Sequence, residues 1–271
     1  MENHRPRLFA VVPTLLTLAN AACGFGAITY VAHVGPDVLG SQHLYVAGWL
    51  IFAAMLFDVF DGQVARWTRQ TSDFGAQLDS FCDLISFGVA PPIMMLAFCD
   101  QYQGRVLWVI ALLFMLCTIL RLARFNVETD EEDAHDVFTG LPSPAAAGTI
   151  AAFAVARPAL YRLAEWQAGG WIQWLGERAA SATTAFLPLL TLLLACLMAS
   201  RIRYPHVANH LFRGRRPYRH VLQLIFAGMV VFLVREIAVL AVPLVFCCFA
   251  LAPPLRAGWQ KAAAHLTRRS P

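Results

Sequence analysis

Long apolar segments alternate with short polar stretches along almost the whole chain. Most of these segments reach or approach the roughly 20 residues that a helix needs to cross the hydrocarbon core of a bilayer. The hydropathy pattern therefore predicts an all-α integral membrane protein, a polytopic bundle of about eight transmembrane helices. The expected segments are 8–33, 43–66, 75–99, 105–126, 143–156, 184–200, 220–234 and 237–252.

Composition supports this prediction. The 271 residues are 58% hydrophobic and only 14% charged, whereas about a quarter of the residues of a soluble domain are charged. No stretch has the composition of a separate soluble domain, so we expect a single membrane domain over 1–271. The first apolar segment is too long for the core of a signal peptide, and we expect it to stay uncleaved.

The distribution of Lys and Arg predicts the orientation. With the N-terminus in the cytoplasm and eight spans, sixteen of the 21 Lys and Arg residues fall on the cytoplasmic side. This asymmetry follows the positive-inside rule and predicts a multi-pass protein of the inner membrane with both termini cytoplasmic. The basic stretch 201–219 would then meet anionic lipid head groups, and we expect no nucleic-acid partner.

Two polar regions and the cysteines are interpreted without a special function. The acidic stretch 128–136 is expected to be a solvated connection rather than a cation site. The stretch 157–182 contains three tryptophans and is expected to form an interfacial connection on the outer face. The seven cysteines lie in or near apolar segments without the paired spacing of a zinc site, and we expect them to behave as small hydrophobic residues.

Four aspartates lie inside or at the edges of apolar segments, where an ionised carboxylate is costly. Asp58 and Asp61 are three residues apart, and Asp79 and Asp83 are four apart, so each pair projects from one face of its helix. A short connection makes the two helices antiparallel neighbours, which brings the four carboxylates together near the cytoplasmic side. Hard oxygen ligands of this number favour Mg²⁺ or Mn²⁺. Structural helix pairs or a proton relay remain the alternative.

The neighbours of the carboxylates suit a phosphate-bearing ligand. Gly62 and Ala65 keep the helix beside Asp61 free of bulk, and Gly75 does the same one turn before Asp79. Arg66 adds a fixed positive charge that can bind a phosphate.

The segment can be written Asp58-x-x-Asp61-Gly62-x-x-Ala65-Arg66, eight residues, Gly75-x-x-x-Asp79-x-x-x-Asp83. At every fixed position it resembles the signature of the CDP-alcohol phosphatidyltransferase family. The resemblance implies that an alcohol displaces CMP from a CDP-linked lipid held by two divalent metals, and that the protein is a homodimer. It implies metal and nucleotide ligation by Asp58, Asp61 and Asp79, metal contact and general-base catalysis by Asp83, and further contacts to the CDP-lipid from Thr17, Gly62, Ala65, Arg66 and Gly75.

Other stretches resemble the phosphatidylserine synthase branch of that family, which uses CDP-diacylglycerol and L-serine. They are 13–24, 79–91, 121–126, 140–148 and 200–205. Residues 8–205 would then form the family core, and 206–271 a basic linker, two further helices and a tail. Thr14 and Ser143 depart from the usual pattern of this branch, in positions that affect fine substrate contacts only.

Serine also carries a carboxylate, so its pocket needs a cation near Asp83. Arg121 and Arg124, with Asn126 beside them, are the available groups at the cytoplasmic end of their helix. The same arginines could instead only anchor that helix at the interface. Two rival functions stay open: the same reaction with inositol phosphate, glycerol phosphate or an archaeal-type lipid substrate, and a cation or proton transporter that uses intramembrane carboxylates.

Overall fold

A computed structural model describes residues 8–33, 39–68, 73–99, 104–128, 137–165, 170–205 and 235–267. These residues are helical apart from two strands of three residues each, which confirms the predicted all-α class and adds a small ribbon that we did not expect. The elements are α1 (Leu8–Ala32), α2 (Leu39–Thr68), α3 (Asp73–Asp83), η1 (Leu84–Val89), α4 (Ala90–Phe98), α5 (Arg105–Glu128), β1 (Val137–Thr139), α6 (Ser143–Glu165), α7 (Gly170–Ala199), β2 (Arg203–Pro205) and α10 (Arg235–Thr267).

Seven of the eight expected segments fall on described helices, and the segment 220–234 lies outside the described residues. Five stretches of the described chain are long and apolar enough to cross a membrane, which agrees with a multi-pass membrane protein. They are Val12–Ala32, Gln42–Val64, Phe74–Phe98, Arg105–Val127 and Gly176–Ala199, and α10 contributes the shorter apolar stretch Ala241–Ala257.

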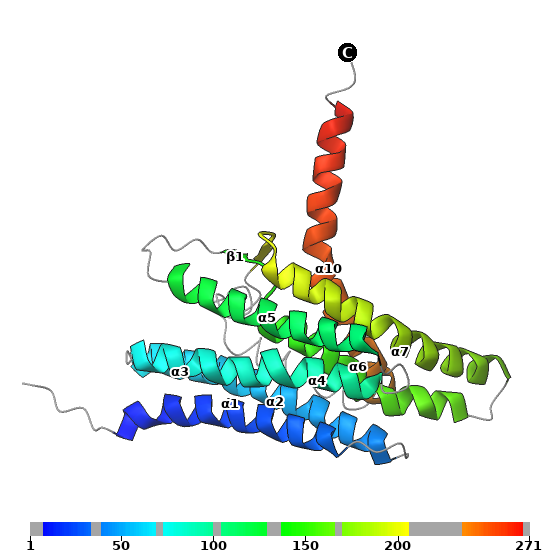
Figure 1. Ribbon diagram of the computed structural model, residues 1–271, viewed down its shortest axis with the longest axis horizontal. Helices are drawn as coiled ribbons and strands as arrows, with labels where there is room; N and C mark the ends of the chain where they lie inside the picture. Colours follow the sequence, from blue (N-terminus) through cyan, green and yellow to red (C-terminus); the bar gives the residue numbers. More distant parts are fainter. Residues whose placement is uncertain are drawn as a thin grey trace, which may run out of the picture.

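The helices α1 to α7 run side by side along the long axis of the molecule, and α10 projects away from this bundle (Figure 1). Helix α1 packs against α2, α3, η1 and α4, so it borders both halves of the aspartate motif. The interior is filled by large apolar side chains such as Phe87, Phe114 and Met94, which are fully buried.

Helix α6 packs against α2, α4, α7 and α10. Its buried face is rich in alanine, so neighbouring helices approach its backbone closely. At Gly48 of α2, an added Cβ would lie 2.9 Å from the Ala151 carbonyl oxygen and 2.7 Å from Val155. Small residues thus lower the hydropathy of α6 while allowing it to pack deep within the bundle.

Several helices extend beyond the segments expected from hydropathy. Helix α6 continues to Glu165 and α7 begins at Gly170, so helix occupies most of the stretch 157–182 that we expected to be a connection. Helical hydrogen bonding satisfies the backbone even where side chains turn polar, and hydropathy cannot detect such extensions. The acidic residues 129–136 lie outside the described residues.

The third expected span, 75–99, is formed by α3, η1 and α4, which follow one another directly, and η1 is a π-helix. The Ala90 N–H donates to the carbonyl of Ile85, five residues earlier. Pro91 and Pro92 follow in the first turn of α4, where a missing N–H is tolerated. Because these prolines cannot donate to the preceding turn, the wider π turns lie directly after Asp83. Such segments often mark functional sites.

The strands β1 and β2 form an antiparallel ribbon in which Phe138 pairs with Tyr204. Gly140 follows β1 with φ of +87°, and an added Cβ would lie 2.6 Å from the Met198 carbonyl oxygen. Its N–H donates to the carbonyl of Ile202 at 2.8 Å. This turn, which only glycine fits, ties the start of α6 to the end of α7 and thereby fixes the position of Ser143.

Candidate active site

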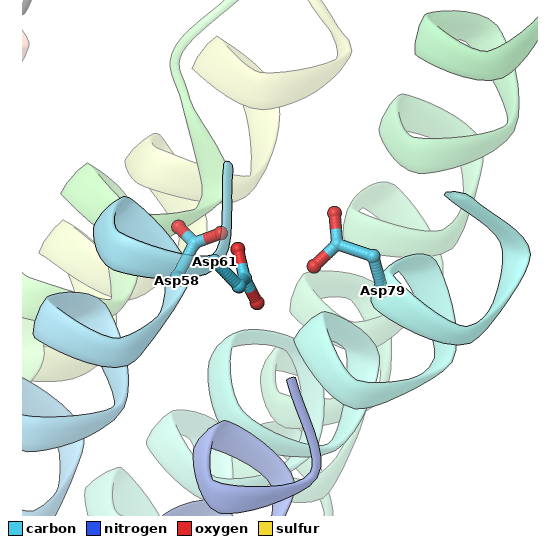
Figure 2. Close-up of side chains that lie close together, drawn as sticks. All are labelled: Asp58, Asp61 and Asp79. Carbon is cyan, nitrogen blue, oxygen red and sulfur yellow. The ribbon is translucent and has the colours of Figure 1, made fainter. Parts of the chain in front are cut away.

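Three carboxylates converge between α2 and α3. Asp58 and Asp61 project from one face of α2 toward Asp79 on α3 (Figure 2). One ligand atom from each residue lies within 4.8 Å of the other two. The helical spacing in the sequence predicted that four carboxylates converge, and among the described residues the structure groups three of them.

The oxygens of this cluster are set up to receive a ligand. Asp61 is only 5% exposed, and Asp61 Oδ2 and Asp79 Oδ1 are buried without a hydrogen-bonding partner in the described part of the chain. Buried polar atoms are normally paired, and several carboxylates so close together repel one another. A divalent cation with hard oxygen ligands would satisfy both requirements, so the residues present fit Mg²⁺ or Mn²⁺.

Asp83 lies at the end of α3, one turn beyond Asp79, and is not a member of this group of three among the described residues. It is 8% exposed. The side-chain amide of Asn20, on α1, donates from Nδ2 to Asp83 Oδ1 at 2.9 Å. Asp83 is therefore a buried carboxylate with one oxygen held by a neutral donor.

Helix α1 contributes two polar side chains to the site. Thr17 lies beside Asp61 and donates its own hydroxyl to the Pro13 carbonyl at 3.0 Å. Asn20, one turn further, was missed by our sequence analysis. The signal was available, because Thr17 and Asn20 are three residues apart on one face of an otherwise apolar helix, and polar groups inside a membrane helix often serve a function.

Arg121 on α5 is half-buried, and its guanidinium interacts electrostatically with Asp83 and Asp58. Its Nη1 donates to the hydroxyl of Ser143 at 2.6 Å. Ser143 is fully buried at the start of α6. Arg121 thus provides a positive charge near Asp83. Its partner Ser143 is one of the two residues that depart from the usual pattern of the phosphatidylserine synthase branch.

The other predicted site residues vary in position. Asn126 exchanges hydrogen bonds with Ser80 on α3, with Asn126 Nδ2 donating to Ser80 Oγ at 3.0 Å, and Arg124 is half-buried on the same helix. Gly62 and Gly75 lie on α2 and α3 close to the aspartates. The side chains of Ala65 and Arg66 lie outside the described residues.

Comparisons with known proteins agree with this site. The family model described as CDP-alcohol phosphatidyltransferase matches residues 10–249. The chain is 33% identical over 194 residues to a CDP-diacylglycerol–serine O-phosphatidyltransferase of Helicobacter pylori, covering 72% of this chain and 71% of the relative.

Two further relatives show the breadth of the similarity. The chain is 28% identical over 203 residues to the Bacillus subtilis protein of the same name, covering 73% of this chain and 92% of the relative. It is 39% identical over 155 residues to an archaetidylserine synthase of Methanothermobacter thermautotrophicus, covering 56% of this chain and 61% of the relative. Because the family model matches most of this chain, the chain belongs to the CDP-alcohol phosphatidyltransferase family.

Proposed function

We propose that this protein transfers the phosphatidyl group of CDP-diacylglycerol to the hydroxyl of L-serine, giving phosphatidylserine and CMP. The observation that carries the proposal is the arrangement of three convergent carboxylates on α2 and α3 with a fourth, separately held, one turn away. The curated relatives named for serine as acceptor support the choice of substrate.

Asp58, Asp61 and Asp79 would hold Mg²⁺ or Mn²⁺, with Asp83 contacting a second ion. The buried, unpartnered oxygens of Asp61 and Asp79 support this assignment. When bound, divalent cations neutralise the diphosphate and stabilise the negative charge on the departing CMP. Gly62 and Gly75 would leave the adjoining backbone open to the CDP group, and we expect Thr17, Ala65 and Arg66 to contribute further contacts to CDP-diacylglycerol.

Asp83 takes the proton of the serine hydroxyl. As the hydroxyl oxygen bonds to the phosphorus that carries diacylglycerol, the bond from that phosphorus to the oxygen of CMP breaks, and CMP leaves with the electron pair. The hydrogen bond from Asn20 fixes the carboxylate of Asp83, so its other oxygen can face the hydroxyl. Because the acceptor attacks phosphorus directly, no covalent enzyme intermediate is required.

The serine carboxylate would bind Arg121, with Arg124 and Asn126 nearby. Arg121 is supported by its electrostatic interaction with Asp83 and by the bond that Ser143 accepts from it. A guanidinium can bind a carboxylate through two parallel hydrogen bonds, which fixes the orientation of the acceptor. A doubly charged phosphate acceptor would need more positive charge than these residues supply.

We also propose an orientation and an assembly for the protein. We place the carboxylates on the cytoplasmic side of the inner membrane, with both termini cytoplasmic and residues 8–205 as the catalytic core of a homodimer. Reporter fusions at each terminus test the orientation, because a C-terminal reporter active only outside the cytoplasm would contradict it. Crosslinking in native membranes tests the dimer.

One experiment tests the reaction. Purified full-length protein is incubated with CDP-diacylglycerol, a divalent cation and one acceptor at a time: L-serine, inositol phosphate or glycerol phosphate. Of these three acceptors, we expect only L-serine to give CMP release and a new lipid. Release with another acceptor would change the substrate, and metal-dependent cation flux without binding of CMP would indicate a transporter.

A further inference from the structure

The carbonyl oxygen of the Asn20 side chain has no partner in the described part of the chain, although the residue is fully buried. Asn20 is 0% exposed, and its Oδ1 lacks a hydrogen bond among the residues that the structure describes. The other end of the same amide donates from Nδ2 to Asp83 Oδ1 at 2.9 Å. A carboxylate oxygen pairs with the N–H end of the amide, so this bond also determines which way the amide faces. A buried acceptor left unpaired is costly, which suggests that a ligand supplies its donor.

The position of this oxygen is fixed by the packing of α1 against η1. The Ser86 hydroxyl donates to the backbone carbonyl of Asn20 at 2.8 Å. One turn along α1, Gly24 lies directly against Ser86, and a Cβ there would lie 2.6 Å from the Ser86 Cα. The helices therefore cannot separate or slide at this point without losing these contacts. Asn20 presents its free oxygen beside Asp83 before any substrate arrives.

We propose that Asn20 Oδ1 accepts a hydrogen bond from the ammonium group of the acceptor amino acid and so helps to select serine. This inference rests on the proposed function. In serine the hydroxyl and the ammonium are on adjacent carbons, so a molecule with its hydroxyl at Asp83 carries its ammonium close to the amide bonded to Asp83. Its carboxylate is then free to meet Arg121, whose charge acts on Asp83.

Three groups of the acceptor would thus contact three different side chains. The hydroxyl would contact Asp83, the ammonium would contact Asn20, and the carboxylate would contact Arg121. The diacylglycerol part of CDP-diacylglycerol offers no donor to Asn20, because its ester groups only accept hydrogen bonds. A site built to pair with a polar group discriminates strongly against analogues that lack this group, since its own buried atom is then left unpaired.

The test compares L-serine with two analogues that keep the hydroxyl, each lack one other group and are used as competitors of serine. Ethanolamine lacks the carboxylate, and 3-hydroxypropionate lacks the ammonium. In the full-length enzyme, we expect Asn20→Ala to raise the KM for serine and the inhibition constant of ethanolamine about tenfold or more. The inhibition constant of 3-hydroxypropionate and the KM for CDP-diacylglycerol should stay within about twofold of wild type. Thr29→Ala removes an exposed hydroxyl of the same helix, which donates to the Phe25 carbonyl at 2.9 Å, and should change neither inhibition constant.

Asn20→Asp keeps an oxygen acceptor but loses the donor to Asp83, so we expect kcat to fall while the KM for serine stays nearly unchanged. This variant decides the question if Asn20→Ala does not fold. A larger KM for CDP-diacylglycerol in Asn20→Ala would assign the oxygen to the nucleotide and overturn the inference. Equal losses for both inhibitors, or no change in either, would also overturn it. If the wild-type enzyme does not use serine, the proposed function itself fails, which is a separate and recognisable result.

Discussion

The four aspartates have two kinds of surroundings, which differ in whether the carboxylate oxygens have hydrogen-bonding partners among the described residues. Asp58, Asp61 and Asp79 converge across α2 and α3, and buried oxygens of the last two lack a partner among the described residues. Asp83, one turn further along α3, has an oxygen that accepts a hydrogen bond from the amide of Asn20. Open carboxylates are suited to ligation and a held carboxylate is suited to orientation. The same residue type thus has two different surroundings within one turn of helix.

Removal of divalent cations should have the largest effect, because the open carboxylates cannot hold a diphosphate without them. We expect excess chelator to reduce CMP release to background, and added Mg²⁺ or Mn²⁺ to restore it. The relative rates with the two ions establish which one the enzyme prefers. Full turnover in chelator would show that the open cluster has another purpose, and the comparison would fail.

Asp83→Asn should separate the held carboxylate from the open ones. The substituted amide keeps an oxygen for the bond from Asn20 but cannot accept the proton of the serine hydroxyl. Turnover should fall about 10²- to 10⁴-fold, or about 3 to 5 kcal/mol of barrier. Binding of CDP-diacylglycerol, measured by competition with a labelled CDP-lipid, should largely persist.

Asp58→Asn provides the matched comparison from the open cluster. It should weaken metal and nucleotide binding together, because it removes charge from the site that would hold the cation. Near-normal turnover in Asp83→Asn, or loss of nucleotide binding as complete as in Asp58→Asn, would show that the two surroundings do not correspond to two roles.

The sequence predicted the open cluster better than the held carboxylate, for a physical reason. Convergence of Asp58, Asp61 and Asp79 follows from helical periodicity and one short connection, both of which are local. The partner of Asp83 is 63 residues away on α1. Arg121 donates a hydrogen bond to Ser143, which follows a turn that depends on Gly140. The helical class and seven of the eight expected segments follow from hydropathy, whereas the ribbon depends on contacts between distant elements.

Gly24→Ala should disturb the held carboxylate through packing alone. The added methyl group would contact Ser86 Oγ and lie 2.6 Å from the Ser86 Cα, so backbone must move. We expect a loss of about 1 to 3 kcal/mol in unfolding free energy, measured in detergent, and a lower kcat. Gly26→Ala is the control, because its Cβ would meet only the flexible end of Leu50 at 3.3 Å. Equal effects of the two substitutions would show that the contact between α1 and η1 is not what fixes Asp83.

Ser143→Ala should produce the smallest change, because Ser143 acts on Asp83 only through Arg121. Ser143 accepts a hydrogen bond of 2.6 Å from Arg121, and its removal leaves the guanidinium free to turn away from Asp83. A hydrogen bond of this kind contributes about 1 to 2 kcal/mol, so the KM for serine should rise about five- to thirtyfold while kcat and the KM for CDP-diacylglycerol change little. Ser143→Thr retains the hydroxyl and should recover most of the affinity for serine. If Ser143→Ala lowered kcat and left the KM for serine unchanged, Arg121 would act on the reacting groups themselves. Its role would then be catalytic, and it would not serve to orient serine.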